Sequence, residues 1–285
     1  MKRFGLPLVL AVSAATTLAG CAADQGAEPV TRPPAGVSVS LAQWRSDEPV
    51  HALQIAVRNT TTTPVYFADV QLVTASFETL PPQRADATIR RTERTDLPIT
   101  YGEANCAPSG LPRLQPATVV ARVRTGDEPL RKVVFTVPHP DPLLSRLLRE
   151  ECSAYLVKQA ATLSFGPDWK RDGELMRGSL VLTRRGAGTV SVTSVDGTTH
   201  YMVTPGVRRR PLVTLEAGAR RAEAPIALSP GRCDPHAFAE AKKAFQFPVR
   251  ASVDGGEERI VIVTPPQDAQ DRLIDYALRV CGLRG

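Results

Sequence analysis

The chain has 285 residues, of which 42% are hydrophobic, and its formal net charge is +6. This length is enough for two domains with buried cores, and the composition excludes a chain that is disordered throughout. The net charge falls to +4 if Lys2 and Arg3 are removed with a leader, so the balance is only weakly basic and does not indicate a nucleic-acid partner.

The first twenty residues have the pattern of an export signal. Lys2 and Arg3 precede the apolar run 5–15, which is too short to span a bilayer comfortably. The signal ends in Leu18-Ala19-Gly20-Cys21, which resembles the lipobox of bacterial lipoproteins. The resemblance implies cleavage before Cys21, lipidation of its thiol and an anchor on the extracytoplasmic face of the cell membrane. The alternative is an ordinary secretory signal that happens to precede a cysteine.

Residues 21–36 combine the lipidated cysteine with a proline-containing stretch that lacks apolar periodicity, which is typical of a flexible tether. We therefore expect the folded part to begin near Val37.

The folded part contains an internal repeat. The only two tryptophans, Trp44 and Trp169, are 125 residues apart, and the apolar positions around them recur at the same offset. The matched positions are Ile55 and Leu180, Val57 and Leu182, Val65 and Val190, and Phe67 and Val192; farther on, at an offset of 127, they are Pro98-Ile99 and Pro225-Ile226, Cys106 and Cys233, and Val133-Phe135 and Ile260-Ile262. The pattern favours a duplicated domain, with units at 37–154 and 160–285 and only Tyr155–Gln159 between them.

Apolar residues alternate with a period of two inside each unit, which indicates strands. In 51–58, Leu53, Ile55 and Val57 share one face, as expected for a half-buried strand. Further strands are expected near 119–124, 131–137, 247–253 and 259–264, with turns rather than helices between them. The fold class is therefore mainly β, as two tandem immunoglobulin-like sandwiches.

Each unit is predicted to end in one helix. Asp141 and Pro142 are suited to the N-cap and first position of a helix with a stripe of Leu143, Leu144, Leu147 and Leu148. Asp268 and Asp271 are predicted to open the second helix, whose stripe is Leu273, Ile274, Ala277 and Leu278.

Four cysteines remain once Cys21 is assigned to lipid, and an exported protein favours their oxidation. Of the three possible pairings, the repeat selects Cys106 with Cys152 and Cys233 with Cys281, because these are equivalent bonds within the two units. Each bond is expected to hold the terminal helix to its sandwich.

No catalytic motif is recognisable. Serine-nucleophile, phosphate-loop, His-Glu-x-x-His and dinucleotide patterns are all missing from the sequence, so we expect no catalytic residue and no cofactor. Cys233 and His236 could begin a metal site, but Cys233 is assigned to a disulfide and no second ligand pair has suitable spacing, so no metal is expected. The carboxylate pairs 47–48 and 257–258 and the arginine runs 208–210 and 220–221 are interpreted as solvated surface, although the arginines could also contact anionic headgroups.

The segment from Asp234 to Lys243 differs most between the units. Its polar residues Asp234, His236, Lys242 and Lys243 replace a plainer stretch at 107–115, which makes them the candidate contact for a partner. The alternative is a short helix that only covers the end of the sandwich. The stretch 233–243 with Phe247-Pro248-Val249 resembles an uncharacterised family of secreted and lipid-anchored proteins of actinobacteria, a resemblance that implies compartment but no site residues.

The sequence thus predicts a non-enzymatic surface lipoprotein that binds an envelope protein or cell-wall partner. One alternative is an enzyme or metal-handling protein whose site is not visible as a motif. The other is small-molecule binding in the cleft between the two units.

Overall fold

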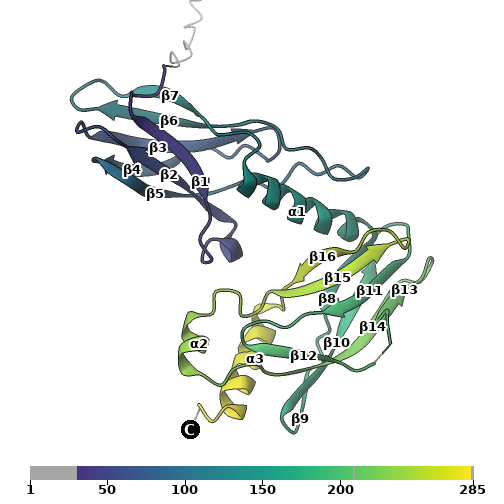
Figure 1. Cartoon of the computed structure of the whole chain (residues 1–285). Helices are drawn as coiled ribbons and strands as arrows, with labels where there is room; N and C mark the ends of the chain where they lie inside the picture. The colour runs from purple at the N-terminus through teal and green to yellow at the C-terminus, as the bar shows by residue number, and fades with distance from the viewer. Residues whose placement is uncertain (1–30, 208, 284–285) are drawn as a thin grey trace, which may run out of the picture.

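The computed structural model describes residues 31–207 and 209–283, and within these ranges the chain forms four antiparallel sheets and three α-helices (Figure 1). The protein is therefore mainly β, as predicted. Cys21 and the proposed export signal lie outside the described residues. No helix among the described residues is long and apolar enough to cross a membrane.

Two sheets enclose the core of the N-terminal half. One has the order β1 (Val37–Ala42), β2 (Ala52–Asn59), β5 (Thr92–Thr100), and the other β4 (Gln83–Ile89), β3 (Val65–Thr74), β6 (Ala117–Thr125), β7 (Arg131–Thr136). Leu53 and Ile55 from the first sheet and Phe67 and Val119 from the second are fully buried in one hydrophobic cluster. The core therefore forms between the sheets, as alternation along the strands requires.

The C-terminal half repeats this arrangement. One sheet has the order β12 (Tyr201–Pro205), β14 (Arg221–Pro230), β10 (Leu175–Arg184), β8 (Ala161–Phe165), with β9 (Lys170–Asp172) beside β10, and the other β13 (Val213–Leu215), β11 (Val190–Val195), β15 (Phe247–Val253), β16 (Arg259–Val263). The order β8-β10-β14 reproduces β1-β2-β5, and β13-β11-β15-β16 reproduces β4-β3-β6-β7. The matched residues Ile55, Leu180, Phe67 and Val192 all have no exposed surface.

The repeat is offset by 128 residues in the last two strands, not by 127. Val119 pairs with Phe135 in β6–β7, and Phe247 pairs with Val263 in β15–β16, so Phe135 corresponds to Val263. Ile260 and Ile262, which the sequence matched to core positions, are instead 44% and 46% exposed. Since Ile260–Val263 is an unbroken β-branched run, its composition does not show which alternate residues face the core, and a slip of one residue reverses the two faces.

The strand β2 is also more buried than predicted. Its outer residue Gln54 is buried because the turn around the short 3-10 helix η1 (Glu48–Val50) packs over it, and Gln54 Nε2 donates a hydrogen bond of 3.0 Å to Asp47. Asp47 is therefore a buried residue that organises this turn rather than a solvated carboxylate.

The helix α1 (Pro142–Ala160) begins as predicted, with the Asp141 side chain accepting a hydrogen bond from the Leu144 amide. Leu144 and Leu148 belong to the first core, whereas Val157 and Ala160 belong to the second. Residues 155–159, which were expected to separate two units, are helical and complete α1, so one helix connects the two cores directly (Figure 1).

The helix α3 (Gln267–Val280) closes the C-terminal half. Its N-cap is Pro266, which makes no side-chain capping bond; the predicted Asp268 lies in the first turn, and Asp271 lies farther along the helix. Leu273 and Ala277 are buried as expected, and so is Tyr276, whose hydroxyl donates a hydrogen bond to the Leu228 carbonyl. The disulfides join Cys106 to Cys152 and Cys233 to Cys281, the two pairs selected by the repeat.

Candidate functional site

The segment that follows Cys233 forms the short helix α2 (Pro235–Glu240). Asp234 caps it by accepting a hydrogen bond of 2.9 Å from the His236 amide. On its inner side Ala237 is buried and the Phe238 ring stacks on His200 at a centroid distance of 4.4 Å. This helix therefore covers one end of the second core, as the plainer interpretation of the sequence proposed.

The outer side of the same segment lines a groove of about 440 Å³ between the two halves of the molecule. All four candidate contact residues line it. The full lining consists of Arg45 and Glu48 from the N-terminal half and Thr199, Arg232, Asp234, His236, Ala237, Glu240, Ala241, Lys242 and Lys243 from the C-terminal half. The segment that covers the second core thus also lines the groove, and Ala237 takes part in both.

The groove is polar and carries charges of both signs. Lys243 forms an ion pair with Glu48 across the groove, and Arg232 lies 3.5 Å from Asp234. Within the described part of the chain, Arg45, Glu240 and Lys242 make no ion pair, so their charges remain available to a ligand. The arrangement suits a partner that presents polar and charged groups.

His200 supports the groove from inside the protein. It is buried, and its Nε2 lies 3.2 Å from the Ala237 carbonyl oxygen, which can only accept a hydrogen bond. Burial lowers the pKa of His200, and its Nδ1 has no hydrogen-bond partner among the described residues. The neutral imidazole therefore links the core to α2, a role that nothing in the sequence around His200 indicated.

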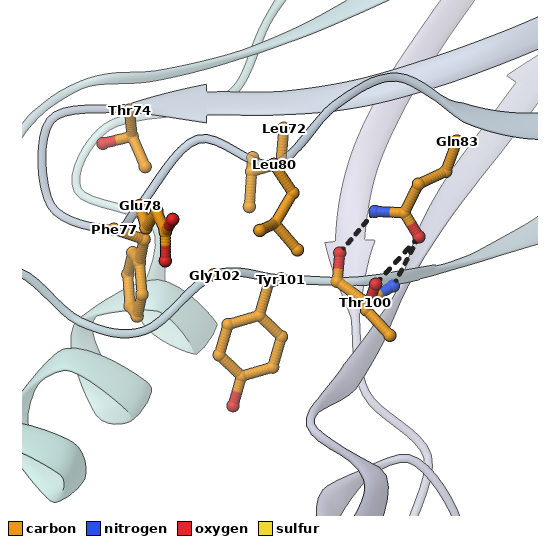
Figure 2. Close-up of a pocket in the computed structure, with 9 residues that line it drawn as sticks. All are labelled: Leu72, Thr74, Phe77, Glu78, Leu80, Gln83, Thr100, Tyr101 and Gly102. Atoms are coloured by element: carbon orange, nitrogen blue, oxygen red, sulfur yellow. Dashed lines mark hydrogen bonds between the residues drawn. The ribbon is translucent and has the colours of Figure 1, made fainter.

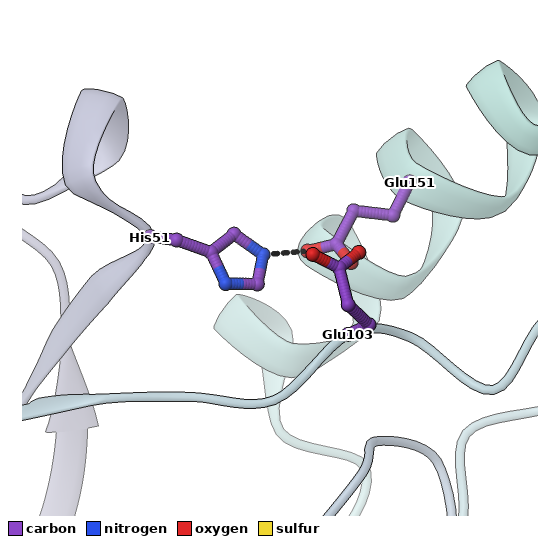
Figure 3. Close-up of side chains that lie close together, drawn as sticks. All are labelled: His51, Glu103 and Glu151. Atoms are coloured by element: carbon purple, nitrogen blue, oxygen red, sulfur yellow. Dashed lines mark hydrogen bonds and ion pairs between the residues drawn. The ribbon is translucent and has the colours of Figure 1, made fainter.

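A second cluster lies in the N-terminal half. His51, Glu103 and Glu151 each place a nitrogen or oxygen ligand atom within 4.8 Å of those of the others (Figure 3). His51 Nε2 lies 3.1 Å from Glu151 Oε1, and the hydrogen bond with Glu151, followed by the negative charge of that carboxylate, raises the pKa of His51 against the effect of burial. The cluster pairs a basic nitrogen with two carboxylates.

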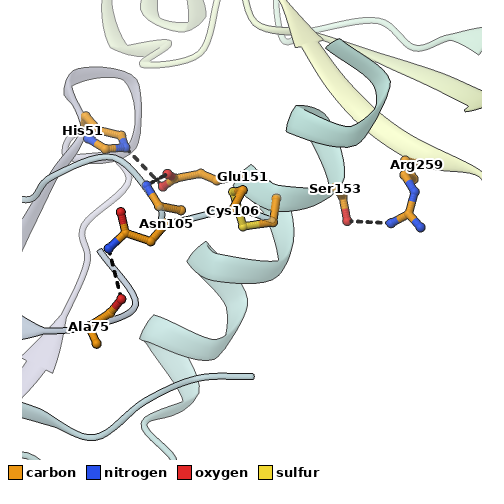
Figure 4. Close-up of a disulfide and its surroundings, with 9 residues drawn as sticks. His51, Ala75, Asn105, Cys106, Glu151, Ser153 and Arg259 are labelled. Carbon is orange, nitrogen blue, oxygen red and sulfur yellow. Dashed lines mark hydrogen bonds and ion pairs between the residues drawn. A yellow bond between two sulfur atoms is a disulfide. The ribbon is translucent and has the colours of Figure 1, made fainter. Parts of the chain in front are cut away.

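The Cys106–Cys152 disulfide holds the segments that carry these carboxylates. Glu103 lies in the loop before Cys106. Glu151 precedes Cys152 on α1, and Figure 4 shows its side chain beside the disulfide. The Ala104 amide donates a hydrogen bond of 3.0 Å to Glu151 Oε2, which fixes that side chain further. Sequence reasoning missed the cluster because its three members are about fifty residues apart and form no local motif.

A small cavity beside Tyr101 is not a ligand site. Its lining includes Phe77, Thr100 and Tyr101 (Figure 2). Its volume is about 10 Å³, which is the space of a single water molecule. The side chain of Gln83, on its wall, bonds to Thr100: the Thr100 amide and hydroxyl donate to Gln83 Oε1, and the Thr100 carbonyl accepts from Gln83 Nε2.

The predicted surface charges outside the groove are paired or solvated. Arg221 pairs with Glu223 at 2.6 Å, and Arg259 pairs with Glu257 at 3.1 Å. Arg209 and Arg210 are exposed, and Arg208 lies outside the described residues.

The chain matches no protein-family profile, and no curated protein is similar enough in sequence to count as a relative. Among solved structures it is similar to an exo-chitosanase of Amycolatopsis orientalis, at 12% identity and a TM-score of 0.20, over 73% of this chain and 25% of that one. It is also similar to a transglutaminase of red sea bream, at 8% identity and a TM-score of 0.25, over 82% of this chain and 32% of that one. A glycosyl hydrolase family 2 member of Bacteroides cellulosilyticus gives 10% identity and a TM-score of 0.21, over 76% of this chain and 23% of that one. This chain thus spans less than a third of the length of each of these proteins, and similarities at such TM-scores carry no argument about function.

Proposed function

We propose that the protein is a lipid-anchored, non-enzymatic binding module on the extracytoplasmic face of the cell membrane, and that the groove between its halves contacts an envelope protein or cell-wall partner. The observation that carries the proposal is the lining of the groove. Nine of its eleven residues come from the C-terminal half, and they include Asp234, His236, Lys242 and Lys243.

The proposal includes two tandem immunoglobulin-like sandwiches. The strand orders support it, because β1-β2-β5 corresponds to the A-B-E sheet of such domains and β3-β6-β7 to the C-F-G sheet, with β4 added at the edge. The same order recurs in the C-terminal half. Domains of this class commonly bind through their ends and through the surfaces between neighbours.

The position of the groove suits a partner away from the membrane. The described chain begins at Thr31, whose amide bonds to the Lys132 carbonyl in β7. In Figure 1, β7 lies at the outer edge of the N-terminal half, whereas α2 lies in the C-terminal half on the side toward the N-terminal half. The sequence predicted a flexible tether up to residue 36, but the chain already contacts β7 at Thr31, so an anchor at Cys21 would join the folded part on the side of the N-terminal half away from the groove.

The chemistry of the lining favours a polar partner over a small apolar molecule. The volume of about 440 Å³ falls within the range of ligand pockets, but such pockets are lined mainly by apolar and aromatic side chains. Here only Ala237 and Ala241 are apolar. A peptide segment or glycan that presents charged and hydroxyl groups would match the surface better.

Lipid anchoring is tested by Cys21→Ser. We expect the protein to leave the membrane fraction or to accumulate unprocessed, because the acylated thiol is lost. Normal processing with unchanged membrane retention would contradict the anchor.

Partner binding is tested by placing a photo-crosslinking amino acid at Lys242 in cells that express the protein. We expect a discrete covalent adduct from this position, and none from the matched control Arg210, which is exposed outside the groove. Replacing His236 and Lys242 with alanine should weaken binding of the crosslinked partner to the purified protein while leaving the thermal midpoint unchanged. Equal adducts from both crosslinker positions would argue against the groove as the contact surface.

A further inference from the structure

The hydrogen bonds of His51 leave one ring nitrogen directed at carboxylates. Its Nδ1 lies 2.9 Å from the Tyr101 carbonyl oxygen, which can only accept, so Nδ1 carries a hydrogen. In the neutral imidazole, Nε2 then has no hydrogen and carries a lone pair. This lone pair faces Glu151 Oε1, which lies 3.1 Å from Nε2 (Figure 3). Two acceptors at this distance repel each other, so a cation, either a proton or a metal ion, must lie between them.

The second carboxylate favours a metal ion. Glu103 is exposed and its carboxylate makes no hydrogen bond or ion pair with any described residue, yet it lies within 4.8 Å of the other two ligand atoms. A proton on Nε2 would form a hydrogen bond with Glu151 alone and would attract Glu103 only through its charge. A divalent ion would be bound by all three groups and would neutralise both carboxylates.

The geometry lies within reach of metal coordination. Ligand atoms around a tetrahedral Zn²⁺ ion, with bonds of about 2.1 Å, are roughly 3.4 Å apart. The separation between His51 Nε2 and Glu151 Oε1 is already 3.1 Å, and the exposed Glu103 has room to move inward. The Tyr101 carbonyl and the Ala104 amide orient the other two ligands in the manner of second-shell partners in metal sites.

The C-terminal half shows that the fold does not need these charges. By the offsets of the repeat, the positions equivalent to His51, Glu103 and Glu151 are Met176, Pro230 and Val280. The equivalent disulfide still forms there. The charged cluster is therefore an addition to one half rather than a requirement of the shared framework.

We infer that His51, Glu103 and Glu151 bind a divalent ion of the first transition row, such as Zn²⁺, with water completing its coordination. One imidazole and two carboxylates suit such ions, whereas Ca²⁺ and Mg²⁺ are bound mainly by oxygen ligands. Three protein ligands leave a position open to solvent, and the His51 side chain is 38% exposed. The site is separate from the groove and does not depend on its function.

The test is Zn²⁺ binding to the full chain, purified in detergent without a polyhistidine tag, with its disulfides intact and metal removed by a chelator. Calorimetric titration should show one Zn²⁺ bound per chain, with Ca²⁺ binding much more weakly. Glu103→Gln should weaken Zn²⁺ binding by more than about tenfold, a loss that even second-shell changes produce in metal sites. Glu103 is exposed, and its carboxylate makes no ion pair within the described part of the chain, so this variant should fold normally.

There are two matched controls. Glu150→Gln changes an exposed carboxylate that pairs with Arg146 and lies next to Glu151 on α1. His236→Ala removes a histidine from the C-terminal half. Both should bind Zn²⁺ as the wild type does. Substituting Co²⁺ should give a ligand-field absorption spectrum that Glu103→Gln alters. Failure of the wild type to take up one Zn²⁺, or equal uptake by Glu103→Gln, would overturn the inference and leave a protonated His51 paired with Glu151.

Discussion

The two disulfides join equivalent positions in the two halves. The first links the loop after β5 to α1, and the second links the loop after β14 to the end of α3. In the N-terminal half the bond brings Glu103 and Glu151 toward His51. In the C-terminal half it anchors the segment that continues into α2, which forms a wall of the groove. A repeated framework thus supports different surface chemistry in its two copies, and the candidate sites lie where the copies differ.

The tryptophans that mark the repeat make the same point. Trp44 is 52% exposed, and its Nε1 donates a hydrogen bond to Asp96 while Arg94 lies over its ring. Trp169 packs against the second core, and its buried Nε1 has no hydrogen-bond partner among the described residues. Equivalent places in sequence therefore do not imply equivalent environments outside the sheets.

Removing each disulfide in turn should show that the zinc site and the groove depend on different halves of the protein. Replacing Cys106 and Cys152 with alanine should abolish Zn²⁺ binding and spare crosslinking at Lys242, whereas replacing Cys233 and Cys281 should do the reverse. Each pair should also lower the free energy of unfolding by about 2–5 kcal/mol. Chemical denaturation, zinc titration and crosslinking would check this, and equal loss of both sites in either variant would show that the halves are not functionally distinct.

The corrected repeat offset is tested in β16. Val261→Ala should cost about 2 kcal/mol of unfolding free energy, because Val261 is buried and pairs with Val249. Ile262→Ala, at an exposed position, should change stability by less than about 0.5 kcal/mol. Denaturant titration of both variants beside Val133→Ala, the N-terminal equivalent of Val261, would measure the difference. A larger loss of unfolding free energy in Ile262→Ala than in Val261→Ala would support the offset of 127 instead.

Acid should weaken the C-terminal half through His200. Burial lowers its folded pKa below the usual 6.5, so below that pH the unfolded chain binds the proton more readily and stability falls with the pH. The aligned residue in the N-terminal half is Ala75, which has no such titration. Comparing unfolding from pH 8 to pH 5 for the wild type and His200→Gln should show a smaller acid loss in the variant. Identical pH profiles would exclude this role for His200.

The smallest effect is expected from the ion pair between the halves. Lys243 and Glu48 are both partly exposed, so a double-mutant cycle with Lys243→Met and Glu48→Gln should give a coupling energy of no more than about 1 kcal/mol. The coupling should decrease in high salt. A coupling that is larger and independent of salt would mean that this pair fixes how the halves are joined.

The sequence by itself determined the parts of the protein that depend on short-range patterns. The alternation around Leu53 and Ile55 gave a strand, the Asp141-Pro142 pair gave the start of α1, and the repeat selected the disulfide partners. These succeed because strand faces, helix caps and equivalent positions follow from residue order alone. The same reasoning identified the polar segment 234–243 as the candidate contact, although it did not show that Arg45 and Glu48 would lie opposite.

Only the tertiary structure decided the remaining features. The faces of Ile260–Val263 were settled by pairing with β15, because a uniformly apolar run has no preferred face of its own. Residues 155–159, the only stretch that the sequence placed between the two units, are helical and lead directly from one core to the other. The groove and the His51 cluster both require side chains from distant segments to meet, and such contacts are set by how sheets, helix and disulfide pack rather than by any local spacing.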